Sequence, residues 1–428
     1  MLSLLRQRNY ALLWWSALVS GIGNFVLIAA LPYYVYSISG STLASGATFV
    51  SETVPMILFS SVGGVFADRW ERKRIIISSD WLRGLILLPL LVVHSTASLW
   101  IVYVVAFLGS SVANFAGPFG NAALPHVVRE DELPTANAAF SAGGFLAVLV
   151  GSSLGALLLQ HVGLRGVVLA DAATFAFSAL LISLIGIAFE GRAPGASSQL
   201  RSATGLGRAW RDWLVGVRFV LEQRWVSLVF LVMMLVFLGN SMVSVCLAPF
   251  VRHVLHGSAQ IYAWTLTAQG IGGVFASVFI GSITRRISPE RLLAWSIVSL
   301  GILDIGIAVA QSVQVTLGAA LIAGIAVLFG VAGMNTLVQA KVPDALRGRV
   351  SGAFLTTSAL MSLTGSLIAS VCADRVGIRL MLGIGGGVFA VAGFTALMML
   401  VPLMQRMRER ELSPQPVLAS LRSHLQEE

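Results

Sequence analysis

The sequence Gly64-Val-Phe-Ala-Asp-Arg-Trp-Glu-Arg-Lys-Arg74 joins two long apolar stretches, and Gly281-Ser-Ile-Thr-Arg-Arg-Ile-Ser-Pro-Glu-Arg291 joins two others, 217 residues later. A second pair of landmarks repeats with an offset of 218 residues at its prolines: Leu124-Pro-His-Val-Val-Arg129 and Val342-Pro-Asp-Ala-Leu-Arg347. Two independent landmarks with nearly one offset predict that the chain contains two similar halves in the same orientation.

The composition places the chain in a membrane. Of its 428 residues, 57% are hydrophobic and 11% are charged, whereas soluble domains carry about 25% charged residues. A soluble enzyme is excluded because most of this apolar surface would remain in water. A membrane helix needs about 20 to 25 apolar residues, so a chain of this length holds about a dozen. We therefore expect an all-α polytopic protein with about 12 transmembrane helices, near residues 10–36, 43–67, 75–94, 99–120, 139–162, 167–189, 226–250, 261–283, 292–311, 315–336, 351–373 and 378–403.

The longest polar break divides the chain near its middle. Residues 191–207 are rich in Gly, Ser and Ala, which is typical of a flexible linker. The next apolar residues recur at helical spacing and predict an amphipathic helix on the membrane surface, the alternative being a solvated linker; they are Trp210, Trp213, Leu214, Val217 and Leu221. We expect a six-helix half at 1–190, this linker at 191–225, a second six-helix half at 226–403 and a tail at 404–428.

The positive charges predict the orientation in the membrane. The net charge of +9 would suggest nucleic acid in a soluble protein, but here the basic residues follow the predicted topology. Of the 28 Lys and Arg residues, 23 fall in one set of alternate breaks, 4 fall in the other and Arg83 lies within a span. Loops rich in Lys and Arg face the cytoplasm. We expect a multi-pass cell-membrane protein with both termini in the cytoplasm, and no nucleic-acid partner.

The sequence lacks the motifs that are typical of ATP binding and of metal-dependent catalysis. A phosphate-binding loop needs a Gly-Lys pair, and neither Lys73 nor Lys341 follows a glycine. No His-Glu-x-x-His or Cys-x-x-Cys spacing occurs, and we expect Cys246 and Cys372 to be free thiols. These absences predict no ATP, metal or cofactor and no enzymatic activity, which leaves secondary transport driven by an ion gradient.

The sequence resembles the major facilitator superfamily over nearly its whole length. The loop between the second and third helices carries that superfamily's signature, although Glu71 stands where the signature has a second glycine; the matching residues are Gly64, Asp68, Arg69, Arg72 and Lys73. Further segments resemble the drug/proton antiporter branch that includes macrolide-efflux proteins and the enterobactin exporter. They are Arg8-Asn-Tyr-Ala-Leu-Leu-Trp14, Asp80-Trp-Leu-Arg83, residues 123–137, Asp171-Ala-Ala-Thr-Phe175 and residues 339–350.

This resemblance implies the major facilitator fold and a latch in the signature loop. Asp68 is expected to accept hydrogen bonds at the start of a neighbouring helix, while Arg69, Arg72 and Lys73 engage carboxylates or lipid phosphates. Arg347 and Arg349 are expected to act similarly in the second half. The alternative is a solvated basic loop that only sets the topology.

Acids within the spans are the candidates for ion coupling, because an ionisable group in a membrane is costly. Glu52 is interpreted as a proton carrier or cation-binding acid, or else as a structural acid bonded to a neighbouring helix. Asp80 and Arg83 are expected to form an ion pair at the inner rim, with gating as the alternative. Asp304 is a weaker coupling candidate. Asp171 is expected at the start of the sixth helix, near the outer surface, where the helix dipole stabilises its carboxylate. Its role there is expected to be structural.

The superfamily resemblance also implies a cavity lined by the first, fourth, seventh and tenth helices, each of which carries an asparagine. The candidates for contact with the substrate are Asn24, Phe25, Asn114, Phe115, Asn240, Asn335 and Gln339. No Lys or Arg is expected at mid-membrane depth to bind an anion. We therefore expect a monomeric, proton-coupled exporter of small lipophilic neutral or cationic compounds, such as antibiotics. The alternatives are export of a siderophore or lipid-like metabolite, or a sensor or scaffold that transports nothing.

Overall fold

A computed structural model describes residues 4–67, 71–186, 214, 217–341 and 344–412. These residues form helices and contain no strand, and twelve of the helices are long and apolar enough to cross a membrane. The predicted all-α, twelve-helix architecture is confirmed. Lipid imposes this outcome, because a helix satisfies its own backbone hydrogen bonds where water is absent.

The first six spans run from α1 to α6, with short 3₁₀ segments between them. They are α1 (Arg8–Ser39), α2 (Thr42–Ala67), α3 (Arg72–Leu87) continued by η2 (Leu88–Val92), α4 (Leu99–Ala123) followed by η4 (Leu124–His126), α5 (Leu133–His161) and α6 (Leu164–Ser183). The remaining helices are α8 (Arg224–Pro249), α9 (Ala259–Arg286), α10 (Pro289–Val309), α11 (Val313–Lys341), α12 (Asp344–Val376), α13 (Ile378–Thr395) and α14 (Val401–Leu412).

The connections at one end of the molecule are very short, and glycines make the turns. Gly40, Gly163 and Gly377 have φ values of 64°, 75° and 106°, in the region that favours glycine over residues with a Cβ. The α5–α6 connection consists of Val162 and Gly163 alone. Such tight turns fix the position of each helix along the axis of the helix that precedes it.

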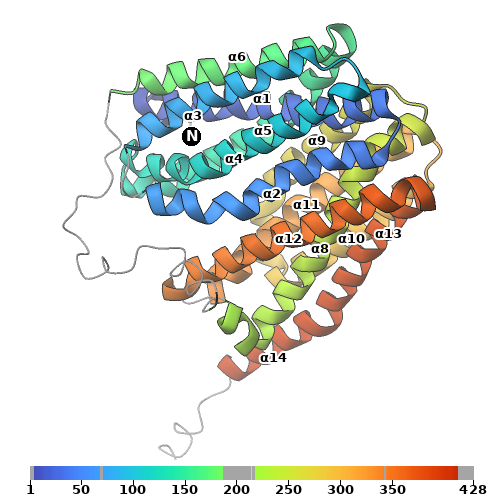
Figure 1. Ribbon diagram of the computed structural model, residues 1–428. Coiled ribbons are helices and arrows are strands. Elements are labelled where there is room, and N and C mark those ends of the chain that lie inside the picture. Colours follow the sequence, from blue (N-terminus) through green and yellow to red (C-terminus); the bar gives the residue numbers. More distant parts are fainter. Residues whose placement is uncertain (1–3, 68–70, 187–213, 215–216, 342–343, 413–428) are drawn as a thin grey trace, which may run out of the picture.

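The helices lie in two bundles, α1 to α6 and α8 to α14, which Figure 1 shows converging at one end and diverging at the other. We call the diverging end, where α1 and α8 begin and α6 ends, the linker end. The converging end, where α1 meets α2 and α12 meets α13, is the far end. Two helix pairs make most of the contact between the bundles, α2 with α12 and α5 with α9, and α1 also touches α8 and α9.

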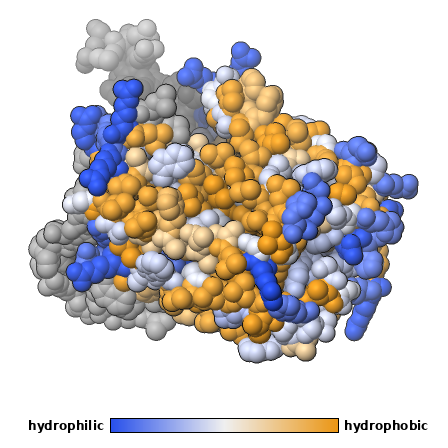
Figure 2. All heavy atoms as spheres, turned by 90° about the horizontal axis from the view of Figure 1, so that it is seen from above, coloured by the Kyte–Doolittle hydropathy of each residue, from blue (hydrophilic) through white to orange (hydrophobic). Residues whose placement is uncertain are grey.

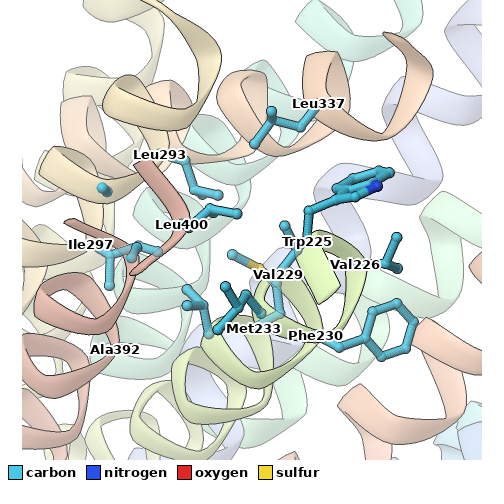
Figure 3. Close-up of a cluster of buried hydrophobic side chains, with 14 of the residues drawn as sticks. Trp225, Val226, Val229, Phe230, Met233, Leu293, Ile297, Leu337, Ala392 and Leu400 are labelled. Carbon is cyan, nitrogen blue, oxygen red and sulfur yellow. The ribbon is translucent and has the colours of Figure 1, made fainter. Parts of the chain in front are cut away.

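Apolar side chains fill each bundle. In the second bundle, Figure 3 shows a cluster formed by α8, α10 and the helical turn η8 (Ala396–Leu400) that follows α13. Its members include Trp225, Val229, Leu293, Ile297 and Leu400. Hydrophobic side chains cover most of the middle of the outer face in Figure 2, and hydrophilic ones gather towards its two ends. This belt matches the requirement of a protein that spans a bilayer.

Most of the predicted amphipathic helix lies outside the described residues. Residues 217–222 are helical, and Arg218 Nε donates to Glu222 Oε1 at 2.7 Å. Val220 is buried against the core of the second bundle, whereas Leu221 is exposed.

Close backbone contact between α9 and α11 depends on two glycines. A Cβ at Gly324 would overlap the carbonyl oxygen of Gln269, and a Cβ at Gly272 would overlap that of Leu321. A Cβ at Gly318, also in α11, would meet nothing within 4 Å. Small residues at helix interfaces of membrane proteins allow this approach.

We therefore expect Gly324→Ala to lower thermal stability, because the two helices must separate at a cost of about 1 to 3 kcal/mol. The matched control Gly318→Ala should not destabilise the protein. The measurement is the temperature at which the purified protein loses its monodisperse size-exclusion peak. Equal midpoints for the two variants would contradict this account of the packing.

Candidate functional site

A ladder of polar side chains connects α1, α3 and α6 inside the first bundle. The hydroxyl of Ser178 donates to Asp80 Oδ2 at 2.6 Å, and Ser16 Oγ lies 2.8 Å from Ser178 Oγ. Asp80, Ser178 and Ser16 are all buried. The carboxylate of Asp80 is therefore held in the interior by hydroxyl groups from neighbouring helices.

One turn further along α3, Arg83 lies at the next level of the ladder. Its Nη2 donates to Asn24 Oδ1 of α1, and its Cζ lies 4.1 Å from the centroid of the Phe175 ring. Among the described residues, no carboxylate oxygen lies within 4 Å of the guanidinium. The expected Asp80–Arg83 ion pair is therefore not formed.

Arg83 also lies deeper than the sequence suggested. It is 11 residues from Arg72, where α3 begins, which corresponds to about 16 Å along a helix, or half of the ~30 Å hydrocarbon thickness. The expectation that no Lys or Arg occupies mid-membrane depth was wrong. Arg83 is also too far from the signature loop to belong to a latch there.

Asp171 lies deep in α6, not at its start. The helix begins at Leu164, so Asp171 is two turns inside it and only 1% exposed. Thr174 Oγ1 lies 3.4 Å from Asp171 Oδ1, while Oδ2 is buried and has no hydrogen-bond partner among the described residues. Gly23 of α1 makes room for this carboxylate, because a Cβ there would overlap Oδ1. The expected role at the helix start was wrong.

Two cavities lie inside the first bundle, and Arg83 lines both. The first, of about 200 Å³, is lined by Asn24, Glu52, Arg83 and Asp171 together with apolar residues of α1, α3 and α4. The second, of about 430 Å³, is lined by Asp80 and Arg83 with Ser16, Ser20 and Asn137. The second extends to Leu124 at the linker end, whereas the first extends towards the far end.

Glu52 belongs to the first cavity and approaches it from α2. Its side chain is half-buried, and among the described residues no hydrogen bond to its carboxylate is present. Its backbone carbonyl accepts a hydrogen bond of 2.6 Å from Ser110 of α4. Glu52 therefore presents a free carboxylate to a cavity that also contains Arg83 and Asp171.

The signature loop lies at the linker end. Arg72 Nη1 donates to His126 Nε2 at 2.7 Å, and Lys73 Nζ donates to the Ile185 carbonyl at 2.7 Å. Burial and the Arg72 guanidinium both lower the pKa of His126, so its neutral form accepts this bond. The two basic side chains tie α3 to α4 and α6.

The other residues predicted for the latch lie in α2, in α12 and outside the described part of the chain. Gly64 lies in the helical backbone of α2, while Asp68 and Arg69 fall outside the described residues. Arg347 and Arg349 lie in the backbone of α12 and Gln339 in that of α11, and only their backbone is described.

Contacts between the two bundles concentrate at the far end. The backbone N–H of Thr42, where α2 begins, donates to both carboxylate oxygens of Asp374 at 3.1 and 3.0 Å, and Ser41 adds a contact of 3.4 Å. Asp374 lies in the last turn of α12. A carboxylate at the positive end of a helix dipole is stabilising. This contact therefore joins the first bundle to the second.

Hydroxyl groups add further contacts across the same interface. Tyr33 donates to the carbonyl of Gly257 at 2.9 Å, and its ring stacks on Tyr262 with centroids 6.0 Å apart. Ser153 Oγ of α5 lies 2.8 Å from Thr267 Oγ1 of α9. The far end is closed in this structure.

The predicted cavity residues do not share one environment. Asn24 binds Arg83, Asn114 donates to the Ser110 carbonyl one turn earlier in its own helix, and Asn240 and Asn335 are exposed. Phe25 packs against α5 beside Gly151, and Phe115 lies 5.8 Å from Phe119 between ring centroids.

The remaining candidates lie apart from this site. Asp304 is buried in α10 of the second bundle, next to Gly386 of α13, and it lines neither of the two cavities. Within the described part of the chain, no group of three or more His, Cys, Asp or Glu side chains is placed to hold a metal ion. Cys246 and Cys372 are free.

Sequence reasoning missed the central place of Asp171 and Arg83. The available signal was the spacing of Asp171, Phe175 and Ser178, which lie on one face of α6. The sequence does not show which residues of α3 lie against α6, so the groups that contact this face could not be predicted from it.

Comparison with known proteins agrees with this architecture. A family model described as "Transmembrane secretion effector" matches residues 1–424. The multidrug efflux pump Tap of Mycolicibacterium fortuitum is 25% identical over 426 residues, covering 95% of this chain and 98% of Tap. Macrolide efflux protein A of Streptococcus pyogenes is 22% identical, covering 86% and 90%.

A solved structure has the same fold. The nucleoside transporter NupG (D323A mutant) superposes with a TM-score of 0.72 at 15% identity, covering 91% of this chain and 99% of NupG. Because the family model spans nearly the whole chain, this protein belongs to the transmembrane secretion effectors of the major facilitator superfamily, and is a multi-pass transporter of the cell membrane.

Proposed function

We propose that this transporter is a proton-coupled exporter of lipophilic neutral or cationic compounds. The observation that carries the proposal is the cavity inside the first bundle, where Glu52 presents a carboxylate without a hydrogen-bond partner among the described residues. A half-buried carboxylate without a hydrogen-bond partner takes up and releases protons, because neither charge state is strongly held in a partly dry site. Glu52 is the proton carrier in this proposal, and Asp80 faces the second cavity.

The charges of the two cavities favour a neutral or cationic cargo. Glu52, Asp80 and Asp171 supply three carboxyl groups, and Arg83 is the one cationic side chain among the described lining residues. An anion would meet excess negative charge when these acids are ionised. The efflux pumps named among the relatives support the same cargo class by similarity.

Transport would proceed by alternating access between two bundles that move as units, at residues 1–190 and 226–403. The structure is closed at the far end, and in this proposal the linker end faces the cytoplasm, because the basic loops gather there. Cargo would enter between the bundles from that side. A monomer is sufficient, since each chain contains both bundles.

A transport assay tests the proposal. An efflux-deficient bacterium that expresses the protein should exclude ethidium or resist erythromycin, and collapse of the proton gradient should abolish either effect. Glu52→Gln should remove uphill export at equal expression, because an amide cannot take up and release a proton near physiological pH. Asp131→Asn is the matched control, since Asp131 is exposed in a short 3₁₀ helix, η5 (Glu130–Glu132), outside the spans.

Export that persists in Glu52→Gln with an intact dependence on the proton gradient would rule out Glu52 as the carrier. Protection from none of a panel of macrolides, dyes and other amphiphiles would favour a dedicated metabolite carrier or a protein that transports nothing.

The far-end interface gives a separate test of alternating access. In a variant without Cys246 and Cys372, cysteines introduced by Ser153→Cys and Thr267→Cys should form a disulfide, because the two native oxygens lie 2.8 Å apart. This disulfide should stop export, and a reductant should restore it. Continued export through the cross-linked protein would contradict opening at this end.

Asp374→Asn should slow the formation of that disulfide. Removing the Asp374 charge that faces the start of α2 costs about 1 kcal/mol, which lowers the ratio of the closed to the open far end about fivefold. Asp131→Asn serves again as the control. An unchanged rate of cross-linking would mean that Asp374 does not hold the interface closed.

A further inference from the structure

Two charged groups in the first cavity have no role in the proton pathway described so far. Arg83 and Asp171 line the same cavity as Glu52, and both lie within the bundle. A charge at this depth persists only when other groups compensate it.

The Asp171 carboxyl is only partly satisfied. Its Oδ1 has Thr174 as a neighbour, but Oδ2 is buried and has no partner among the described residues. An ionised oxygen in that position would be uncompensated. A proton on Oδ2, or a cation brought close to it, removes this penalty.

Along the contact of α3 with α6, Arg83 lies between the level of this carboxyl and the level of a second one. The antiparallel contacts of α3 with α6 place Asp80 beside Ser178 and Arg83 beside Phe175. Asp171 is four residues from Phe175, which is one further turn along α6. The position of Arg83 is thus about one helical turn from that of each acid. The guanidinium interacts electrostatically with Asp171 and Asp80, and it forms an ion pair with neither.

Two contacts hold the Arg83 guanidinium, and neither of them neutralises its charge. Asn24 accepts one hydrogen bond, and the Phe175 ring supports the face of the guanidinium. An amide and an aromatic ring stabilise a cation without neutralising it. Because Arg83 lines both cavities, its charge is shared between Asp171 in the first cavity and Asp80 in the second.

We propose that Asp171 is a second proton-binding carboxyl and that Arg83 is its exchangeable counter-ion. When Asp171 is ionised, Arg83 pairs with Asp171; when a proton occupies Oδ2, Arg83 moves to Asp80. Binding forms one O–H bond on the carboxylate, and release returns the proton to water or to Glu52. The inference rests on the proposed function and extends its proton pathway across the bundle.

All groups that face this site enter the balance of charge. The charged or titratable ones are Glu52 of α2, Asp80 and Arg83 of α3, Asp171 of α6 and, across the interface, Tyr262 of α9, which interacts electrostatically with Glu52. The described lining residues from α1, α4 and α5 are uncharged. Three carboxyls facing one guanidinium favour the uptake of protons into this cluster.

The test measures proton binding directly and needs no cargo. Infrared difference spectra of the full chain in lipid nanodiscs, recorded across pH, report protonated carboxyl groups. Asp171→Asn should remove one titrating carboxyl band. Arg83→Gln should make the protonated band persist to a pH higher by about one unit or more, since an opposite charge at this range favours ionisation. Arg83→Lys should retain most of the native titration. Asp131→Asn should remove only the band of an exposed carboxyl that titrates in the ordinary acidic range, and it should leave the other bands unchanged.

An unchanged set of bands in Asp171→Asn would overturn the proposal, as would an unchanged titration in Arg83→Gln. Bands that respond to sodium at constant pH would also overturn it, because the site would then bind a metal cation. If Asp171→Asn does not fold, Asp171→Glu should shift the band without removing it. Proton-driven ethidium export with unchanged bands would refute this inference alone, whereas native bands without any export would refute only the proposed function.

Discussion

A positive charge at the middle of the membrane is the constraint on which the first bundle depends. Arg83 lies at that depth, and its burial is tolerated because Asn24, the Phe175 ring and two neighbouring acids surround it. The same register of α3 against α6 places Ser178 on Asp80. Because every one of these groups compensates another, the three helices α1, α3 and α6 cannot slide past one another without exposing a charge to lipid.

The second constraint is the interface between the bundles. At the far end it is polar and specific, with the α2 terminus bound to Asp374 and the Ser153 and Thr267 hydroxyls in contact. Such contacts are weak enough to break and precise enough to re-form, which suits a surface that opens and closes. The described signature-loop residues Arg72 and Lys73 make their contacts at the opposite end, within the first bundle.

The number of helices could be predicted from the sequence because lipid allows no other spanning structure for apolar stretches of this length. The signature loop was found because its charges are contiguous. The polar ladder could not be found in this way, because Asp80 and Ser178 are 98 residues apart. Asp171 was misplaced because Gly163 makes so tight a turn that α6 begins earlier than hydropathy indicated.

The central claim, that cargo leaves in exchange for protons through this cluster, is tested most directly by following pH. Liposomes containing the purified protein would be loaded with ethidium and diluted into dye-free buffer at equal pH, with a pH indicator trapped inside. The account predicts that ethidium efflux acidifies the interior and that Glu52→Gln abolishes the acidification. Efflux through the wild-type protein without any change in internal pH would contradict it.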